Sequence, residues 1–212
     1  MSTKNMENPA LANIEVQGHT RESFLMRGAI AAGSVYGLAT VGPFVREAIA
    51  QEGGGDIDIL NYALTLEFLE TAFYTQALKE TQGLSGPVKE LATTLRDNES
   101  EHVEAITATI KDLGGKPVPA PGVDFGKAFA SEDSFLMTAQ TFEDLGVGAY
   151  NGAGPMIESP DVLAAAGSIV QVEGRHAGVI RLLRGEQIGD SAFDKGLTME
   201  DVLAAAKPFI KA

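Results

Sequence analysis

Two short motifs of the same form, Glu-x-x-His, constrain the fold of this chain more than any other feature. The first is Glu99-Ser-Glu-His102 and the second is Glu173-Gly-Arg-His176, and together they hold two of the three histidines in the sequence. On an α-helix, residues three apart lie on one face, about 60° around the axis and about 4.5 Å along it. A carboxylate and an imidazole so placed converge on one point, so each motif predicts half of a metal site on a helix.

The sequence around the motifs is duplicated. Glu67 is followed seven residues later by Tyr74, and Glu143 is followed seven residues later by Tyr150. The separation between these two glutamates is nearly the same as the separation between the two Glu-x-x-His motifs. Nearly equal offsets indicate a repeated helical hairpin, in which each half supplies one glutamate from its first helix and one motif from its second.

The distances of these residues from the predicted turns support the same arrangement. Glu67 and Glu99 are equally far in sequence from Gly83, in the first turn, one before it and one after it. Both are therefore about 24 Å from the turn, at one level of an antiparallel hairpin. In the second hairpin, Glu143 and Glu173 are likewise equally far from Glu158, one on each side of it. We therefore expect all four carboxylates at a similar depth.

Turn and capping residues predict an all-α chain with four long helices, one long crossover and a short C-terminal helix. Residues 115–130 contain three prolines and form the crossover between the second and third helices, because such a segment is too long and too proline-rich for a tight turn. Four antiparallel helices with one long connection make a four-helix bundle. The predicted helices run from Asp56 or Asp58 to about Thr81, from Pro87 to Gly114, from a Ser131 cap to a break at residues 152–155, from Pro160 to about Gly185, and from Thr198 onward.

The charge and composition of the chain limit its partners. It has 29 acidic and 16 basic residues, for a formal net charge of −13, and this argues against a nucleic-acid partner because phosphate binding needs clustered Lys and Arg. Cysteine is absent, so any metal must be held by Glu, Asp and His. Four glutamates balance two divalent ions in formal charge, so a site with both ions can be buried.

The first fifty residues are laid out as an export signal. The stretch T-R-E-S-F-L-M-R precedes an uncharged run at residues 28–45, and Ala48-Ile49-Ala50 offers a small-x-small cleavage pattern. The stretch resembles a twin-arginine signal, although Glu22 follows Arg21 where that signal has a second arginine. We therefore predict a signal at residues 1–50 and a bundle domain at 51–212, with no stable membrane span after processing and a periplasmic or cell-surface location. The alternative is a retained helix on a cytoplasmic protein.

The order Glu, Glu-x-x-His, Glu, Glu-x-x-His over residues 56–186 resembles the ferritin-like superfamily, which includes bacterioferritins, rubrerythrins and manganese catalases. Two segments resemble, more narrowly, a bacterial ferritin-like group related to desiccation-related proteins: D-I-L-N-Y-A-L-T-L-E-F-L-E-T-A-F-Y and E-D-L-G-V-G-A-Y. The resemblance implies a dimetal centre. In it, Glu67 and Glu143 would bridge the ions, Glu99 with His102 would hold one ion, and Glu173 with His176 would hold the other.

Several neighbouring residues have less defined roles. Glu70 is the rival of Glu67, but its counterpart in the repeat is Gly146, so we expect it beside the ligands or on the surface. Tyr74 and Tyr150 either donate hydrogen bonds that orient the metal-binding carboxylates or simply pack. Two further glutamates, Glu101 and Glu104, fall off the site face and should be solvated.

Two redox-active ions held by carboxylates suit two-electron chemistry with O2 or H2O2. The first hypothesis is a non-haem di-iron oxidase or ferroxidase-like protein of oxidative or desiccation stress. Iron is favoured over manganese only by its frequency in the superfamily, so manganese-catalase-like peroxide disproportionation is the rival enzyme. A non-catalytic metal-binding stress protein is the third hypothesis. A homo-oligomer is possible, and nothing in the sequence favours a closed storage shell.

Overall fold

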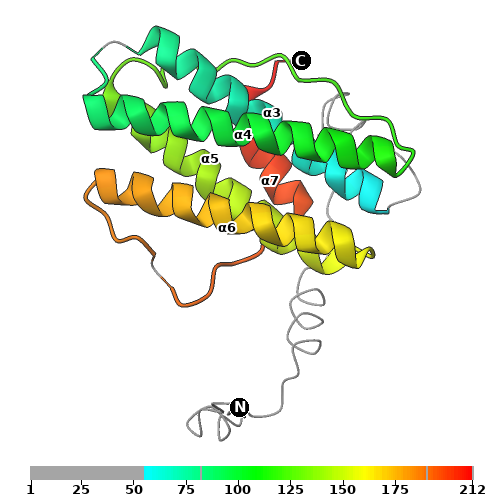
Figure 1. The fold of residues 1–212 in the computed structure, drawn as a ribbon. Helices are drawn as coiled ribbons and strands as arrows, with labels where there is room; N and C mark the ends of the chain where they lie inside the picture. The colour runs from blue at the N-terminus through cyan, green and yellow to red at the C-terminus, as the bar shows by residue number, and fades with distance from the viewer. Residues whose placement is uncertain (1–54, 82, 190, 212) are drawn as a thin grey trace, which may run out of the picture. The chain divides into compact units, whose positions relative to one another are not determined.

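Four long antiparallel helices form a bundle in the computed structural model, which describes residues 55–81, 83–189 and 191–211 (Figure 1). The helices of each predicted hairpin pack on one another, α3 on α4 and α5 on α6. Within the described residues there is no β-strand, only one isolated bridge, so the predicted all-α bundle is confirmed. The helices are α3 (Asp56–Glu80), α4 (Gly86–Asp112), α5 (Glu132–Ala153), α6 (Pro160–Leu183) and the short α7 (Met199–Ala206).

The helix starts follow their local sequence. Ser131 accepts a hydrogen bond from the Ser134 amide to cap α5, and Ser159 caps α6 ahead of its first-turn proline. The start of α3 differs from the expectation, because Gly55 is its N-cap and neither aspartate caps it. The Asp56 carboxylate instead accepts hydrogen bonds from the backbone amides of residues 158 and 159, at 2.7 and 2.8 Å. It therefore ties the start of α3 to the start of α6.

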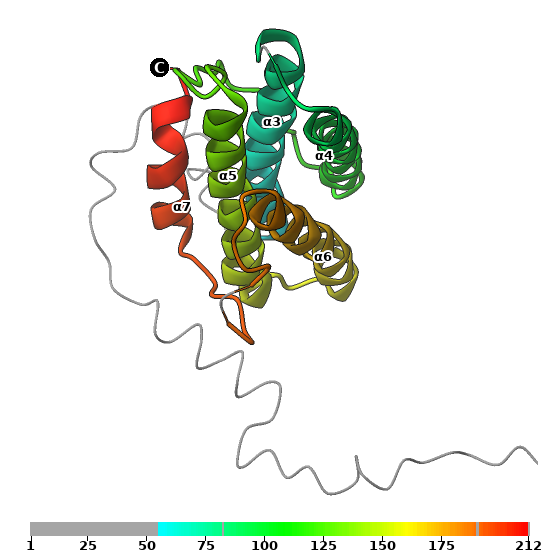
Figure 2. The same ribbon diagram turned by 90° about the vertical axis from the view of Figure 1, so that its left-hand side faces the viewer.

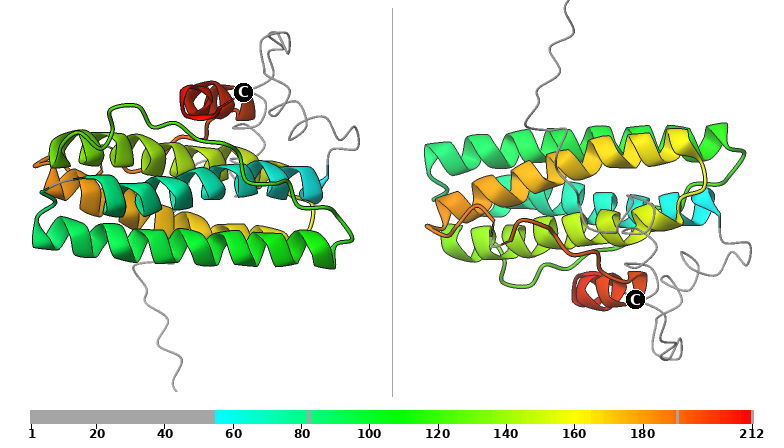
Figure 3. Two further views of the ribbon diagram at one scale, coloured as in Figure 1. Left: turned by 90° about the horizontal axis from the view of Figure 1, so that it is seen from above. Right: turned by 90° about the horizontal axis from the view of Figure 1, so that it is seen from below.

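The connection between α4 and α5 is long, as predicted, and runs along the bundle over residues 113–131 (Figure 3). Asn61, a buried residue of α3, holds it in place: its side-chain amide donates to Lys116 O at 3.2 Å and accepts from Val118 N at 2.8 Å. Further along, Phe125 packs edge-on against Phe73 of α3. These contacts hold the crossover against α3.

The C-terminal segment packs on α5, and Figure 2 shows α7 on the side of α5 away from α4. The Leu197 amide donates to Gly148 O at 2.8 Å, and a Cβ atom at Gly152 would lie only 1.8 Å from Leu197 O. The glycines of α5 thus allow the chain to approach the helix closely. After α5, a 3-10 turn at Gly154–Met156 confirms the predicted break.

No helix within the described ranges is long and apolar enough to cross a membrane. The predicted export signal at residues 1–50 lies outside the described residues.

Candidate metal centre

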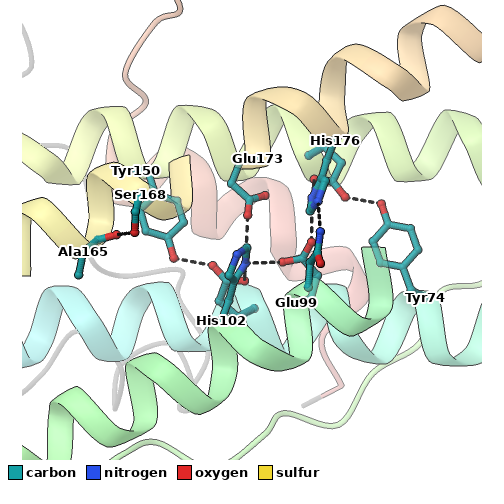
Figure 4. Close-up of polar contacts among 11 residues, drawn as sticks. Tyr74, Glu99, His102, Tyr150, Ala165, Ser168, Glu173 and His176 are labelled. Atoms are coloured by element: carbon teal, nitrogen blue, oxygen red, sulfur yellow. Dashed lines mark hydrogen bonds and ion pairs between the residues drawn. The ribbon is translucent and has the colours of Figure 1, made fainter. Parts of the chain in front are cut away.

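Six side chains from the four long helices converge in the middle of the bundle (Figure 4). α3 and α5 each supply one glutamate, and α4 and α6 each supply one Glu-x-x-His pair. All six predicted metal ligands are in this cluster. They form two overlapping groups, whose ligand atoms lie within 4.8 Å of one another: Glu67, Glu99, His102 and Glu173 in the first, and Glu99, Glu143, Glu173 and His176 in the second.

The carboxylates shared by both groups are Glu99 and Glu173, the glutamates of the two motifs. His102 Nδ1 lies 3.3 Å from a Glu173 oxygen, and His176 Nδ1 lies 3.0 Å from a Glu99 oxygen. Each shared glutamate thus contacts the histidine of the other motif. The side chains of the two motifs, one on α4 and one on α6, therefore meet in the middle of the bundle.

The grouping of the donor atoms differs from the expected division of roles. Glu67 and Glu143 were expected to lie between the two ions, but each belongs to one group only. Glu67 Oε2 is 3.2 Å from His102 Nδ1, and Glu143 Oε2 is 3.2 Å from His176 Nδ1. The glutamates of α3 and α5 therefore lie at the two outer ends of the cluster.

Both predicted tyrosines hydrogen-bond to these outer glutamates. The Tyr74 hydroxyl donates to Glu143 Oε1, and the Tyr150 hydroxyl donates to Glu67 Oε1. Each tyrosine therefore reaches the glutamate of the other half of the repeat, which the sequence did not indicate. In both glutamates one oxygen is held by a tyrosine, and the other lies beside a histidine.

Burial and mutual proximity shift the pKa values of the cluster residues. Burial raises the pKa of Glu67 and of Glu173 to about 8, with like-charged neighbours adding to the effect. Burial also opposes ionisation of Glu99, yet its contacts with His102 and His176 lower the pKa of Glu99 to about 2. Despite burial, the surrounding carboxylates raise the pKa of His102 to about 12 and that of His176 to about 10. The carboxylates of the cluster thus favour a positive charge at this site.

The residues fit metal ions if the cluster has buried donor atoms that protons alone cannot pair. Glu173 Oε2 is buried without a hydrogen-bond partner in the described structure. Glu99 Oε1 and Glu173 Oε1 are buried with only a histidine nitrogen nearby, at 3.0 and 3.3 Å, and neither contact has hydrogen-bond geometry. His102 Nδ1 faces oxygens of three carboxylates at 2.8 to 3.3 Å, although one ring nitrogen carries at most one proton. A cation would be bound by all of these atoms. Carboxylate and imidazole donors suit iron, manganese or zinc, so the residues fit a dimetal site.

Glu70 is buried, with 3% of its surface exposed, so it lies beside the cluster and not on the surface. It is outside both groups, whereas Glu67 is in one of them. A Cβ atom on Gly146 would lie 3.1 Å from Glu173 Oε2 and 3.4 Å from Glu70 Oε1. The glycine at the repeat-related position therefore leaves space for both carboxylates. Two more distant glutamates, Glu101 and Glu104, are exposed as expected.

Asn98 was missed by sequence reasoning. Its side-chain amide lies 3.0 Å from His176 Nε2, on the ring edge away from the carboxylates, so it can hold the orientation of that ring. The internal repeat offered no signal for this contact, because the equivalent position in the second half, directly before Glu173, is Val172.

Comparison with known proteins agrees with this geometry. A family model described as a ferritin-like domain matches residues 55–186, more than half of the chain and the whole of the bundle from α3 to α6. A search of curated protein sequences found no significant match. The chain therefore belongs to the ferritin-like domain family.

Proposed function

We propose that this protein is a dimetal-carboxylate oxidase of the ferroxidase type, which oxidises Fe(II) with O2 or H2O2. The observation that carries the proposal is the pair of overlapping four-residue groups with two shared carboxylates. A shared carboxylate has two oxygens and can contact two ions at once. Such a pair of neighbouring sites suits a reaction that transfers two electrons together.

The residues divide into three kinds of role. Glu99 and Glu173 would contribute oxygens to both ions, and His102 and His176 would each face one ion through Nδ1. Tyr74 and Tyr150 each hold one oxygen of an outer glutamate, which leaves Oε2 of that glutamate directed at its histidine and available to an ion. The protein thereby orients its donors before an ion binds.

Two bound iron ions would supply the two electrons that reduce one molecule of O2. In balance, two Fe(II) and O2 with two protons give two Fe(III) and H2O2; with H2O2 as oxidant, two Fe(II) and two protons give two Fe(III) and two waters. The buried cluster excludes bulk water from this chemistry, since every glutamate in it is at most 1% exposed.

The same donors accept manganese, so disproportionation of two H2O2 to two waters and O2 is the competing reaction. A non-catalytic metal-binding protein is the third possibility. A role in oxidative or desiccation stress, and export through residues 1–50, belong to this proposal and are supported by the sequence resemblances alone.

Metal analysis of the protein from its native source, followed by O2 and H2O2 consumption assays, tests the proposal. The double variant Glu99→Ala with Glu173→Ala should lose the metal, because it removes both shared carboxylates. Glu101→Ala is the matched control, since Glu101 is exposed on the same helix as Glu99. Iron with O2 uptake supports the oxidase, manganese with O2 release from peroxide supports the catalase, and inert metal supports the binding protein. Less than one ion per chain, unaffected by the double variant, would sink the dimetal claim.

A further inference from the structure

A small cavity lies beside the cluster, between α3, α5 and the first half of α6. Its volume is about 20 Å³, and almost all of its wall is apolar. Along α3 it extends from Ile59 to Leu66, the residue before Glu67. The wall from α5 is made by Ala149, Tyr150 and Ala153, so small side chains on this helix leave the space open.

The cavity extends from partly exposed residues toward the cluster. Gly154, Ile157 and Ala166 at its wall are partly exposed, and they form its outer end. Tyr150 lines the cavity, and its hydroxyl donates to Glu67 Oε1. Tyr150 therefore contacts both the cavity and an outer glutamate of the cluster, and Figure 4 shows this tyrosine next to His102 at one end of the cluster.

The apolar wall of the cavity favours an apolar occupant. The volume is larger than one water molecule needs, but a stably bound water requires two to four hydrogen-bond partners. Tyr62 and Tyr150 are the wall residues that carry a side-chain hydroxyl, yet almost none of the wall surface is polar. The Tyr150 hydroxyl is already bonded to Glu67. Hydrogen peroxide, with two O–H donors, would leave hydrogen bonds unmade here, whereas a small apolar diatomic molecule would lose none.

We propose that this cavity binds molecular oxygen and is its route to the cluster past Tyr150. This inference rests on the proposed function, which allows O2 or H2O2 as the oxidant, and it assigns O2 to this cavity. The occupancy of the cavity by a small apolar molecule is a property of the wall itself, so it can be tested without any reaction.

Xenon, an apolar probe, tests occupancy in crystals of the full protein under xenon pressure. We expect a xenon peak between Ala63 and Ala153, and loss of that peak in Ala166→Leu, whose larger side chain fills the outer end. Ala165→Leu is the matched control, because the neighbouring position on α6 is exposed and does not line the cavity. Ala153→Val fills the cavity from the opposite wall if Ala166→Leu folds poorly. Absence of xenon from the unmodified protein, or an undiminished peak in both filled variants, would overturn the proposal.

Rapid mixing of the iron-loaded protein with O2 or with H2O2 tests the route. Ala166→Leu or Ala153→Val should slow the reaction with O2 several-fold relative to Ala165→Leu, while the reaction with H2O2 and the iron content stay the same. Equal rates with O2 in all variants would refute the route, and equal slowing with O2 and H2O2 would refute its selectivity. If the unmodified protein binds xenon but does not react with O2, the proposed function fails and the apolar binding site stands.

Discussion

Replacing Tyr74 with phenylalanine should weaken metal binding at one end of the cluster without disturbing the core. The Tyr74 side chain is fully buried, and its ring packs 5.1 Å from that of Phe73 and 6.1 Å from that of Phe135. Phenylalanine keeps these ring contacts and removes only the hydroxyl that donates to Glu143 Oε1. The substitution therefore isolates a single hydrogen bond to a metal-binding carboxylate.

The expected loss follows from the type of bond. Hydrogen bonds to charged groups contribute about 1.5 to 3 kcal/mol, and removing a group that orients a metal ligand typically lowers metal affinity about 10- to 100-fold. This range corresponds to about 1.4 to 2.7 kcal/mol, so the two expectations agree. Only the ion bound by Glu143 and His176 should be affected, because Glu67 at the other end keeps its bond from Tyr150.

Anaerobic calorimetric titration with Mn(II) or Fe(II) measures this loss, and two successive binding steps should be resolved. Tyr150→Phe should produce the same loss at the Glu67 and His102 end. The control is Tyr62→Phe, since the Tyr62 hydroxyl is buried without a hydrogen-bond partner in the described structure and removing it breaks no contact with the cluster. If Tyr74→Phe and Tyr62→Phe bind both ions as tightly as the unmodified protein, the orienting role of Tyr74 is refuted.

Three further outcomes are expected. Gly152→Ala should lower the free energy of unfolding by about 1 to 3 kcal/mol, because the new Cβ atom overlaps Leu197 O and displaces the C-terminal segment. Asn61→Ala should cost about 1 to 3 kcal/mol, because it removes both hydrogen bonds to the crossover. The metal-free protein should lose stability as the pH rises from 4.5 to about 8, because the raised pKa values of Glu67 and Glu173 mean that the folded state keeps protons which the unfolded chain releases.

Thermal and denaturant unfolding measure all three. Gly167→Ala is the control for Gly152→Ala, because a Cβ atom there meets nothing within 4 Å and a helical alanine should stabilise slightly. For the pH series, His102 acts in the same direction, since its raised pKa means that its contribution is lost progressively as the pH rises from 6.5 to about 12. A metal-free protein that gains stability as the pH rises from 4.5 to about 8 would contradict the sign.

The six candidate ligands and the positions of the long helices could be read from the sequence, because both depend on local spacing. A Glu-x-x-His pair shares a helix face whatever surrounds it, and Ser131, Ser159 and Pro160 mark helix starts through bonds to adjacent backbone. The duplication added the comparison of Glu67 with Glu143, which distinguished Glu67 from Glu70.

Only the tertiary structure decided which carboxylates are shared. The division of Glu99 and Glu173 between both groups depends on how α4 and α6 are rotated toward each other, and no spacing within one helix contains that rotation. The same holds for the bonds of Tyr74 and Tyr150 to the opposite halves, for the burial of Glu70 beside Gly146, and for the contact of Asn98 with His176. Helix periodicity determines what lies on each face, while side-chain packing between helices determines what each face meets.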